Sequence, residues 1–218
     1  MQGKPDFTAE SRAYPPDDLP LLTAQLRLPR WDGTGGTRFD RFYRAYARAF
    51  FSYCQNVLLP QAQAALDIAR QNGGALPEWE IRLDTVVTFS HDRLLSLYTD
   101  TTERCGGQRL LLRRSETWEL SDGSLLSMDS LFPGGKPWRR QLLRAAADRI
   151  RQQQEQGIAR YHPDWQRRLR TAFNTDRFYL TEQGLSFYYQ MYAIAPAAEG
   201  IPVFTIPWDK DHGPRLPG

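Results

Sequence analysis

The stretch that decides the fold is FYLTEQGLSFYYQMYAIAPAAEGIPVFTIPW, residues Phe178 to Trp208. Within it, apolar and more polar side chains alternate over Leu185–Tyr192, which is typical of a strand with one buried face. A break follows, because Pro196 cannot donate to a strand ladder and Gly200 permits a positive φ. The next extended run, Ile201–Pro207, predicts a hairpin with a longer loop.

Strands are also predicted upstream of this stretch. Leu21–Leu28 alternates and predicts a first strand. Three further runs, Ile81–Phe89, Leu94–Glu103 and Arg109–Leu120, are separated only by tight turns and must therefore form an antiparallel meander. Because the period-two faces match, we expect Leu185–Tyr192 to lie antiparallel in the same sheet as Ile81–Phe89.

Helical periodicity begins after Thr37, which with Asp40 forms an imperfect capping box. We expect this long helix to pack on the sheet, with Pro60 kinking or interrupting it before it ends at Asn72-Gly73-Gly74. Shorter helices are predicted to begin at Pro137 and at Pro163. The stripe of the long helix recurs at three- and four-residue steps and comprises Phe39, Phe42, Tyr43, Tyr46, Phe50, Tyr53, Cys54 and Val57.

Together these patterns predict an α+β fold. An antiparallel sheet, made of the three-strand meander and the C-terminal hairpin, carries the long helix and the shorter helices packed on it. The polar, proline-containing residues 1–18 predict a flexible arm, residues 19–209 a single domain, and residues 210–218 a tail. With 218 residues, of which 41% are hydrophobic, the chain is long enough for a sizeable core.

The charge of the chain is mildly positive, +3 at pH 7. Its arginines are interleaved with acidic residues, which argues against a nucleic-acid-binding protein and leaves an anionic cell-wall polymer open as a ligand. The sequence has no run of about 20 apolar residues and no signal peptide at Met1. We therefore expect a cytoplasmic protein, or an extracytoplasmic one if an export segment precedes this sequence in the natural protein.

No residue set specifies a reaction, so we predict neither catalytic residues nor a cofactor. The three histidines have no metal-site spacing, so no metal site is expected. No GxSxG elbow occurs, and the glycine-rich Asp32–Gly36 lacks the Lys-Ser/Thr ending of a phosphate loop. Cys54 and Cys105 lack the CxxC spacing of a redox motif, and we expect reduced thiols.

The loop Ala193–Gly200 is the best candidate for a binding surface. Tyrosine gives a large contact area at low entropic cost, and two tyrosines lie on the second face of the predicted strand that leads into the loop. The alternative is that proline and glycine only shape a tight connection between strands. The candidate partner-binding residues are Tyr188, Tyr192, Pro196, Ala197, Glu199 and Gly200.

The same stretch resembles the RsiV-like domain, also called domain of unknown function 3298. The resemblance rests on Phe178–Leu180, Gly184–Tyr188, Tyr192–Pro196, Gly200-Ile201 and Ile206-Pro207, and upstream on Trp118–Gly123 followed by Asp129–Phe132. That bacterial family includes the extracytoplasmic sensor of a lysozyme-responsive anti-sigma factor and an accessory region of some peptidoglycan deacetylases. The chain departs from the family at Ala197, where the family tends to place a tyrosine.

The resemblance implies a binding domain that senses a protein of the lysozyme class or a cell-wall-related ligand, and that is not an enzyme. Lysozymes are commonly basic, so a net-positive chain needs a local acidic patch to attract one. A second hypothesis is an intracellular protein that shares the fold without binding lysozyme. A third is a hydrolase whose polar residues are scattered along the sequence.

Overall fold

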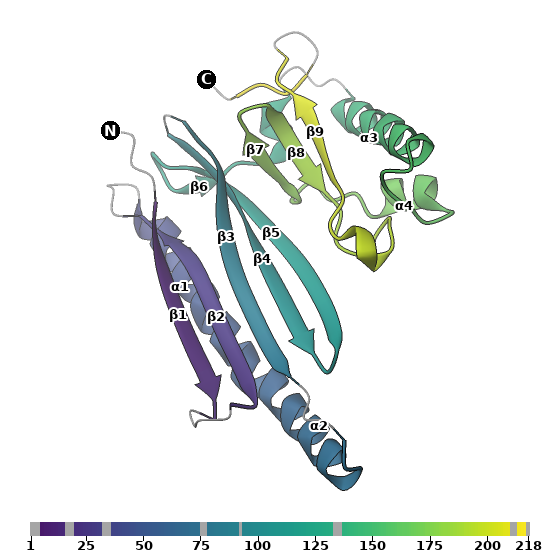
Figure 1. The fold of residues 1–218 in the computed structure, drawn as a ribbon. Coiled ribbons are helices and arrows are strands. Elements are labelled where there is room, and N and C mark those ends of the chain that lie inside the picture. The colour runs from purple at the N-terminus through teal and green to yellow at the C-terminus, as the bar shows by residue number, and fades with distance from the viewer. Residues whose placement is uncertain are drawn as a thin grey trace. The chain divides into compact units, whose positions relative to one another are not determined.

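The computed structural model describes residues 5–15, 20–31, 36–74, 78–91, 93–132, 137–209 and 213–216. It confirms the α+β class: a six-stranded mixed sheet, a three-stranded antiparallel sheet and four α-helices occur within these ranges. The elements, drawn in Figure 1, are β1 (Asp6–Tyr14), β2 (Leu22–Arg30), α1 (Gly36–Tyr53), α2 (Leu59–Gln71), β3 (Trp79–His91), β4 (Leu94–Cys105), β5 (Gln108–Glu119), β6 (Ser124–Leu125), α3 (Trp138–Glu155), α4 (Trp165–Thr171), β7 (Phe178–Thr181), β8 (Gly184–Tyr188) and β9 (Val203–Pro207).

The contacts divide the chain into two compact units. Unit 1 comprises Met1–Thr85, Thr99–Leu112 and Leu120–Gly123, and unit 2 comprises Val86–Tyr98, Arg113–Glu119 and Ser124–Gly218. Strands β3, β4 and β5 contribute residues to both units, because the six-stranded sheet, ordered β1 to β6, runs through them. The predicted meander is confirmed as three consecutive neighbours in this sheet.

The prediction that Leu185–Tyr192 shares a sheet with Ile81–Phe89 is wrong. Strand β8 lies in the separate sheet β7-β8-β9, while β3 lies in the six-stranded sheet. Residues of β8 find their partners nearby in the sequence: Leu185 pairs with Leu180 on one side and with Ile206 on the other. A period-two pattern indicates which side chains share a face, but it does not identify the neighbouring strand.

Unit 1 begins with a strand where the sequence predicted a flexible arm. β1 pairs antiparallel with β2 along its whole length, from Asp6 opposite Arg30 to Tyr14 opposite Leu22. Most of its side chains are exposed, so β1 has no apolar alternation for the sequence to display. Instead, the guanidinium of Arg12 lies over the ring of Phe51 in α1, at 3.6 Å from the ring centroid.

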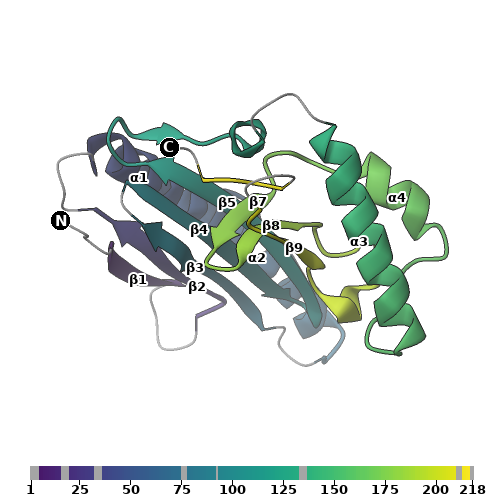
Figure 2. The same cartoon turned by 90° about the horizontal axis from the view of Figure 1, so that it is seen from above.

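The sheet is mixed, not wholly antiparallel as predicted. β2 and β3 are parallel, with Thr23 opposite Glu80. Parallel neighbours need a long crossover, and α1 and α2 supply it. As predicted, the long helix packs on this sheet, where α1 contacts β2 (Figures 1 and 2).

The predicted interruption of the long helix is confirmed. A π-helical turn, Cys54–Leu58, separates α1 from α2, and Pro60 lies in the first turn of α2. The run stays helical through this point, since Leu58 and Leu59 both have helical dihedral angles and the N–H of Leu59 donates to the carbonyl of Cys54; the missing N–H of Pro60 thus falls directly after the π-turn. Of the predicted stripe, Phe39 and Cys54 are buried, whereas Tyr53 and Val57 are exposed beside the π-turn. The capping box at Thr37 lies outside the described side chains.

Both cysteines are unbridged in the structure, Cys54 buried and Cys105 half-buried. Burial raises the pKa of each thiol to about 11. Since the thiolate is the nucleophile, both thiols are poor nucleophiles at neutral pH.

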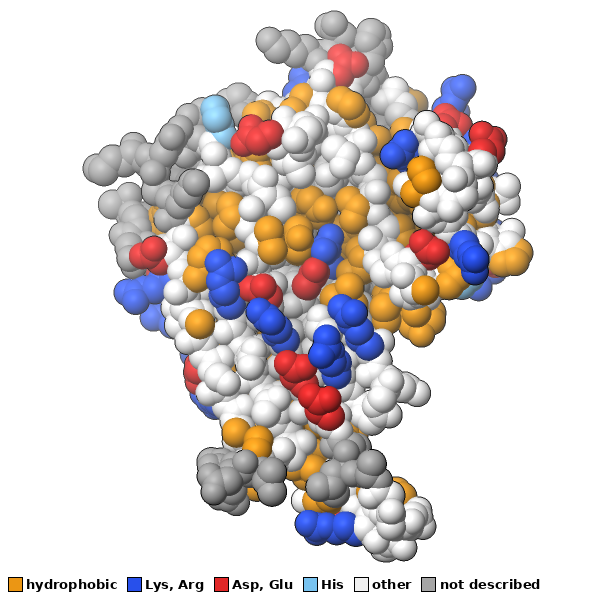
Figure 3. All heavy atoms as spheres, viewed as in Figure 1, with side chains coloured by type: hydrophobic (Ala, Val, Ile, Leu, Met, Phe, Trp, Pro, Cys, Tyr) orange, Lys and Arg blue, Asp and Glu red, His pale blue; other side chains and the backbone are white. Residues whose placement is uncertain are grey.

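One face of the sheet in unit 1 carries charges of both signs. Figure 3 shows arginine or lysine and acidic side chains interspersed over the strands. A shallow hollow on this face is lined by Arg82, Arg104 and Arg109 and by the carboxylates of Glu80, Asp84 and Asp100. Some of these charges pair, as in Arg104 with Glu80 at 3.6 Å. The arginines of this hollow are therefore matched by nearby carboxylates.

In unit 2, helices cover the small sheet. α3 contacts β9 and α4, and it buries Trp138, Leu142, Ala146 and Ile150, which recur at helical spacing. Pro137 is the N-cap of α3 and not its first residue. None of the described helices combines the length and apolar composition needed to cross a membrane.

The predicted C-terminal tail contacts unit 2 where it is described. The N–H of Arg215 donates to the carbonyl of Leu131 at 2.9 Å, and Pro214 is buried. Its carbonyl accepts a hydrogen bond from the N–H of Asp209 at 3.2 Å. Residues 213–216 thus fold back onto the domain.

Candidate functional site

The structure separates the two tyrosines that the sequence placed on one face. β8 ends at Tyr188, so the alternation does not extend to Tyr192. Tyr188 is buried, and Tyr192 is 56% exposed. Both faces of β8 are buried, including Ser186, whose hydroxyl bonds that of Thr205 at 2.8 Å. The predicted exposed face of this strand therefore does not exist.

The exposed Tyr192 has an unusual backbone conformation. Its φ of 69° lies in the left-handed region, which bulky residues rarely adopt and which costs roughly 1–2 kcal/mol. His162 holds the chain on both sides of Ala193: its ring Nε2 lies 3.2 Å from the carbonyl oxygen of Tyr192, and its backbone N–H donates to the carbonyl of Ile194 at 3.0 Å. The ring of Tyr192 thus projects from a fixed backbone.

The rest of the predicted loop is anchored by two buried residues, Ile194 and Ala195. After them a 3-10 turn, Ala197–Glu199, ends at Gly200, whose φ of 68° suits glycine. No side chain of this turn is buried. We call Tyr192, Pro196, Ala197, Glu199 and Gly200 the loop surface.

A tyrosine of the α3–α4 connection lies near the loop surface. The hydroxyl of Tyr161 donates to the Oε1 of Gln153 at 2.6 Å. Its pKa is raised, chiefly by burial and further by the negative charge of Glu199. The carboxylate of Glu199 therefore places a negative charge near the half-buried ring of Tyr161.

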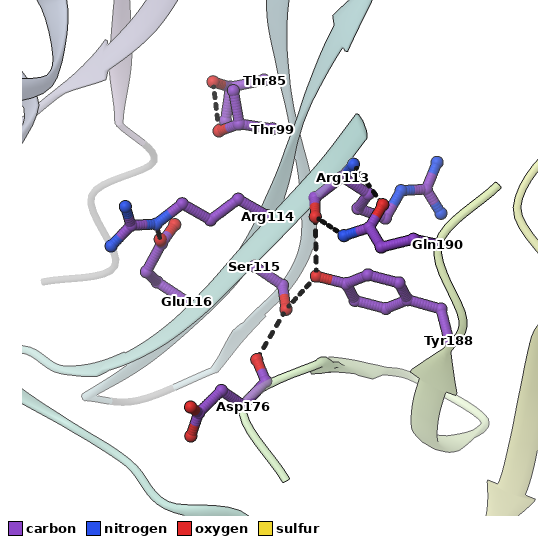
Figure 4. A network of polar contacts seen from close by, with 9 residues as sticks. All are labelled: Thr85, Thr99, Arg113, Arg114, Ser115, Glu116, Asp176, Tyr188 and Gln190. Carbon is purple, nitrogen blue, oxygen red and sulfur yellow. Dashed lines mark hydrogen bonds and ion pairs between the residues drawn. The ribbon is translucent and has the colours of Figure 1, made fainter. Parts of the chain in front are cut away.

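Tyr188 has a structural role, shown in Figure 4. Its hydroxyl donates to the carbonyl of Arg113 in β5 at 3.2 Å and lies 3.2 Å from the hydroxyl of Ser115. Burial raises the pKa of Tyr188 to about 12, so it stays protonated at neutral pH. The buried Tyr188 joins the small sheet to β5 within unit 2.

Arg113 lies among three tyrosine rings. Its guanidinium carbon is 3.7 Å from the ring centroid of Tyr98, 5.9 Å from that of Tyr179 and 5.8 Å from that of Tyr188. A cation over aromatic faces is attracted by the ring quadrupoles. The side chain of Arg113 thereby fills an aromatic cage and fixes β5 against β7 and β8.

The side chain of Gln190 binds the backbone of the same residue. Its Oε1 accepts a hydrogen bond from the N–H of Arg113 at 3.0 Å, and its Nε2 donates to the Arg113 carbonyl at 2.5 Å (Figure 4). This is the pair of bonds that a neighbouring strand would make. Gln190 was not among the residues predicted from the sequence, where its only signal is a single amide among the aromatic residues that follow Ser186.

Next to Gln190 lies a cavity of about 540 Å³, which we call the edge cavity because it borders the outer edge of β5. Its floor includes Leu126 and Phe178, and its polar wall includes Glu116, a nearly fully buried side chain paired with Arg114. The lining residues are Arg113, Arg114, Ser115, Glu116, Thr117, Leu125, Leu126, Ser127, Asn174, Asp176, Arg177, Phe178, Tyr188 and Gln190. Such a volume suits a small ligand or part of a peptide.

Unit 1 holds another hollow, of about 480 Å³, between β1, β2 and α1. Its floor is apolar, with Leu26, Leu28 and Tyr43, and its rim carries Glu10 and Arg44. None of the residues predicted as a binding site lines it. Among the side chains that the structure describes, no three His, Cys, Asp or Glu residues are grouped as metal ligands would be.

Comparisons with known proteins found matches to one family. The model of a protein family of unknown function, DUF3298, matches residues 129–209. No curated protein was found to match the chain. Among solved structures six chains match, and two of them, both DUF3298 structures, are matched over nearly the whole of this chain.

The first of these structures is a DUF3298 family member from Bacteroides fragilis, with a TM-score of 0.64 and 15% identity; the match covers 94% of this chain and 91% of that one. The second is a DUF3298 family protein from Pseudomonas aeruginosa, with a TM-score of 0.59 and 16% identity over 94% of this chain and 90% of that one. At such identities the likeness concerns the fold. With the family model matching residues 129–209, this part of the chain belongs to the DUF3298 family.

Proposed function

We propose that this chain is a non-catalytic binding domain whose loop surface recognises a protein partner, with lysozyme-class proteins as the first to test. One observation carries the proposal: the ring of Tyr192 is 56% exposed on a backbone held in a costly conformation. Strain of this kind persists only where the surroundings enforce it, and it is frequent at binding sites. A backbone fixed in advance loses little entropy when the ring it carries binds a partner.

The charge of the loop surface supports the choice of partner. The chain is net positive, so a basic partner needs a local negative group, and Glu199 of the loop surface supplies one. The polar groups around Tyr188 bond to one another or to the backbone, and they favour a structural role over catalysis. A cell-wall-related ligand is the alternative occupant of the same surface.

We expect Ala197→Tyr to strengthen lysozyme binding by about thirtyfold, since an aromatic anchor commonly contributes 2 kcal/mol or more. Ala197 begins a turn in which no residue is buried, so a larger side chain at this position can extend into solvent. The unmodified chain should bind weakly. Isothermal titration calorimetry of both forms against a panel of lysozymes measures the difference. Tight binding by the unmodified chain, or no gain in the variant, would contradict this prediction.

Tyr192→Asn, made in the Ala197→Tyr background, should remove most of the gained affinity. Asparagine tolerates the left-handed conformation, so the ring is lost while the loop is retained. Tyr53→Asn is the matched control, because Tyr53 is also an exposed tyrosine and lies in unit 1. Equal losses in the two variants would show that the loop surface is not the binding site. Absence of binding in every form would favour a protein that shares the fold without binding lysozyme.

A further inference from the structure

Along the outer edge of β5, the backbone groups of Thr117 and Arg113 are hydrogen-bonded, while those of Ser115, which lies between them, are not bonded to any residue that the structure describes. We call this interruption the gap. On one side of the gap, the carbonyl of Thr117 accepts a hydrogen bond from the N–H of Leu126 at 2.8 Å. On the other side, the Gln190 amide bonds both backbone groups of Arg113. Residues two apart in a strand turn their N–H and C=O to the same edge, so Ser115 also faces this edge.

The chain leaves Ser115 without a strand neighbour. β6 pairs with β5 through Trp118 opposite Leu125 and Glu119 opposite Ser124. Continuing that register would place Met128 opposite Ser115, but a 3-10 helix begins at Met128 and its side chain is buried elsewhere. Among the described residues, Ser115 has no backbone partner at this edge. The edge cavity lies there, and Ser115 lines it.

The cavity offers a cation beside this gap. Arg177 lines it and is half-buried, and no ion pair of its guanidinium occurs in the described part of the chain. Arg114, by contrast, is paired with Glu116. A ligand whose backbone amide bonds the N–H and C=O of Ser115, and whose carboxylate pairs with the guanidinium of Arg177, would give all of these groups partners. Leu126 and Phe178 provide apolar contact for the rest of such a ligand.

We propose that the edge cavity binds an extended acidic peptide segment, one residue of which bonds the backbone N–H and C=O of Ser115 and completes the β5 edge between Leu126 and Gln190. Strand addition at a sheet edge is a general mode of peptide recognition, in which backbone bonds give affinity and side-chain pockets give specificity. Leu126 on one side and the Gln190 side chain on the other already occupy the neighbouring positions of this edge, so only one residue of the peptide can form backbone hydrogen bonds with β5. This proposal does not depend on the loop surface binding lysozyme.

The test is a titration of the full chain, labelled with nitrogen-15, with the capped tripeptide acetyl-Ala-Glu-Ala-amide at up to about 10 mM, since one added residue should give millimolar affinity. We expect the amide resonances of Ser115 and its neighbours on β5 to shift. The same peptide methylated at the central backbone nitrogen cannot donate the bond and should not shift them. Unchanged β5 resonances, or equal shifts with the methylated peptide, would overturn the proposal.

Two variants locate the site. Arg177→Gln should weaken binding of the Glu peptide about tenfold, while leaving that of acetyl-Ala-Gln-Ala-amide unchanged, because only the first has a charge to lose. Tyr192→Asn should leave both affinities unchanged, so that failure here and failure of the loop surface can be told apart. Thermal unfolding confirms that each variant is folded. If the Ser115 resonance instead shifts with protein concentration alone, the edge is occupied by a second copy and the peptide proposal is wrong.

Discussion

Gly184→Ala is expected to lower the free energy of unfolding by about 3 kcal/mol, the upper part of the range for overpacking. A Cβ at this position would lie 1.9 Å from the carbonyl oxygen of Ile206 and 2.7 Å from its carbon. Both are backbone atoms of β9, which pairs with β8 at this point, so no side chain can rotate away. Urea unfolding of the variant and the unmodified chain measures the change.

Gly157→Ala is the matched control for the steric clash expected in Gly184→Ala. Gly157 also lies in unit 2, and its added Cβ would meet nothing within 4 Å. Its φ of 66° leaves only the conformational cost, roughly 1–2 kcal/mol. If Gly184→Ala costs no more than Gly157→Ala, the close approach of β8 and β9 is not what requires glycine.

Ser96→Ala is expected to lower the free energy of unfolding by about 2–3 kcal/mol. Ser96 is fully buried, and its hydroxyl lies 2.7 Å from that of Thr117 and accepts a hydrogen bond from the N–H of Leu180 at 2.8 Å. It joins β4, β5 and β7 within unit 2. Removing the hydroxyl leaves a buried N–H and a buried hydroxyl unsatisfied, and a buried polar group without a partner costs more than a lost bond alone.

Ser186→Ala also removes a buried serine hydroxyl, but this hydroxyl has one hydrogen-bond partner instead of the two that Ser96 has. The hydroxyl of Thr205 is the partner there, and because Thr205 is exposed it can bond water instead. The expected cost is about 1 kcal/mol. Chemical denaturation of both variants measures the difference, and equal costs would show that the Leu180 bond adds nothing to stability.

Much of the secondary structure could be predicted, because it leaves a pattern in the sequence. The turns at Gly106-Gly107 and at Asp122-Gly123 separate strands whose bounds the structure reproduces within a few residues. β1 left no pattern, since its stability comes from backbone pairing with β2 and not from an apolar face. The parallel pairing of β2 with β3 depends on the crossover, which periodicity does not encode.

The part of the candidate site that depends on local sequence could also be predicted. Composition and loop chemistry pointed to the region of Tyr192, and the structure places that ring on the surface. Tyr188 differs because its environment is set by β5, a strand distant in sequence. The gap at Ser115 had no sequence signal at all, because it arises where one strand turns away and a glutamine side chain takes its place.

The crossover between β2 and β3 has a consequence for the order in which the strands form during folding. β2 can pair with β1 through a short connection, but its other neighbour, β3, follows two helices later in the sequence. The edge of β2 that bonds β3 is therefore expected to stay open longer. The strand pairing within the sheet β7-β8-β9 joins only residues 178–207. Because closing a short loop is fast, pulse-labelled hydrogen exchange during refolding should find the amides of β8 protected before those amides of β2 that bond β3, and the reverse order would contradict this expectation.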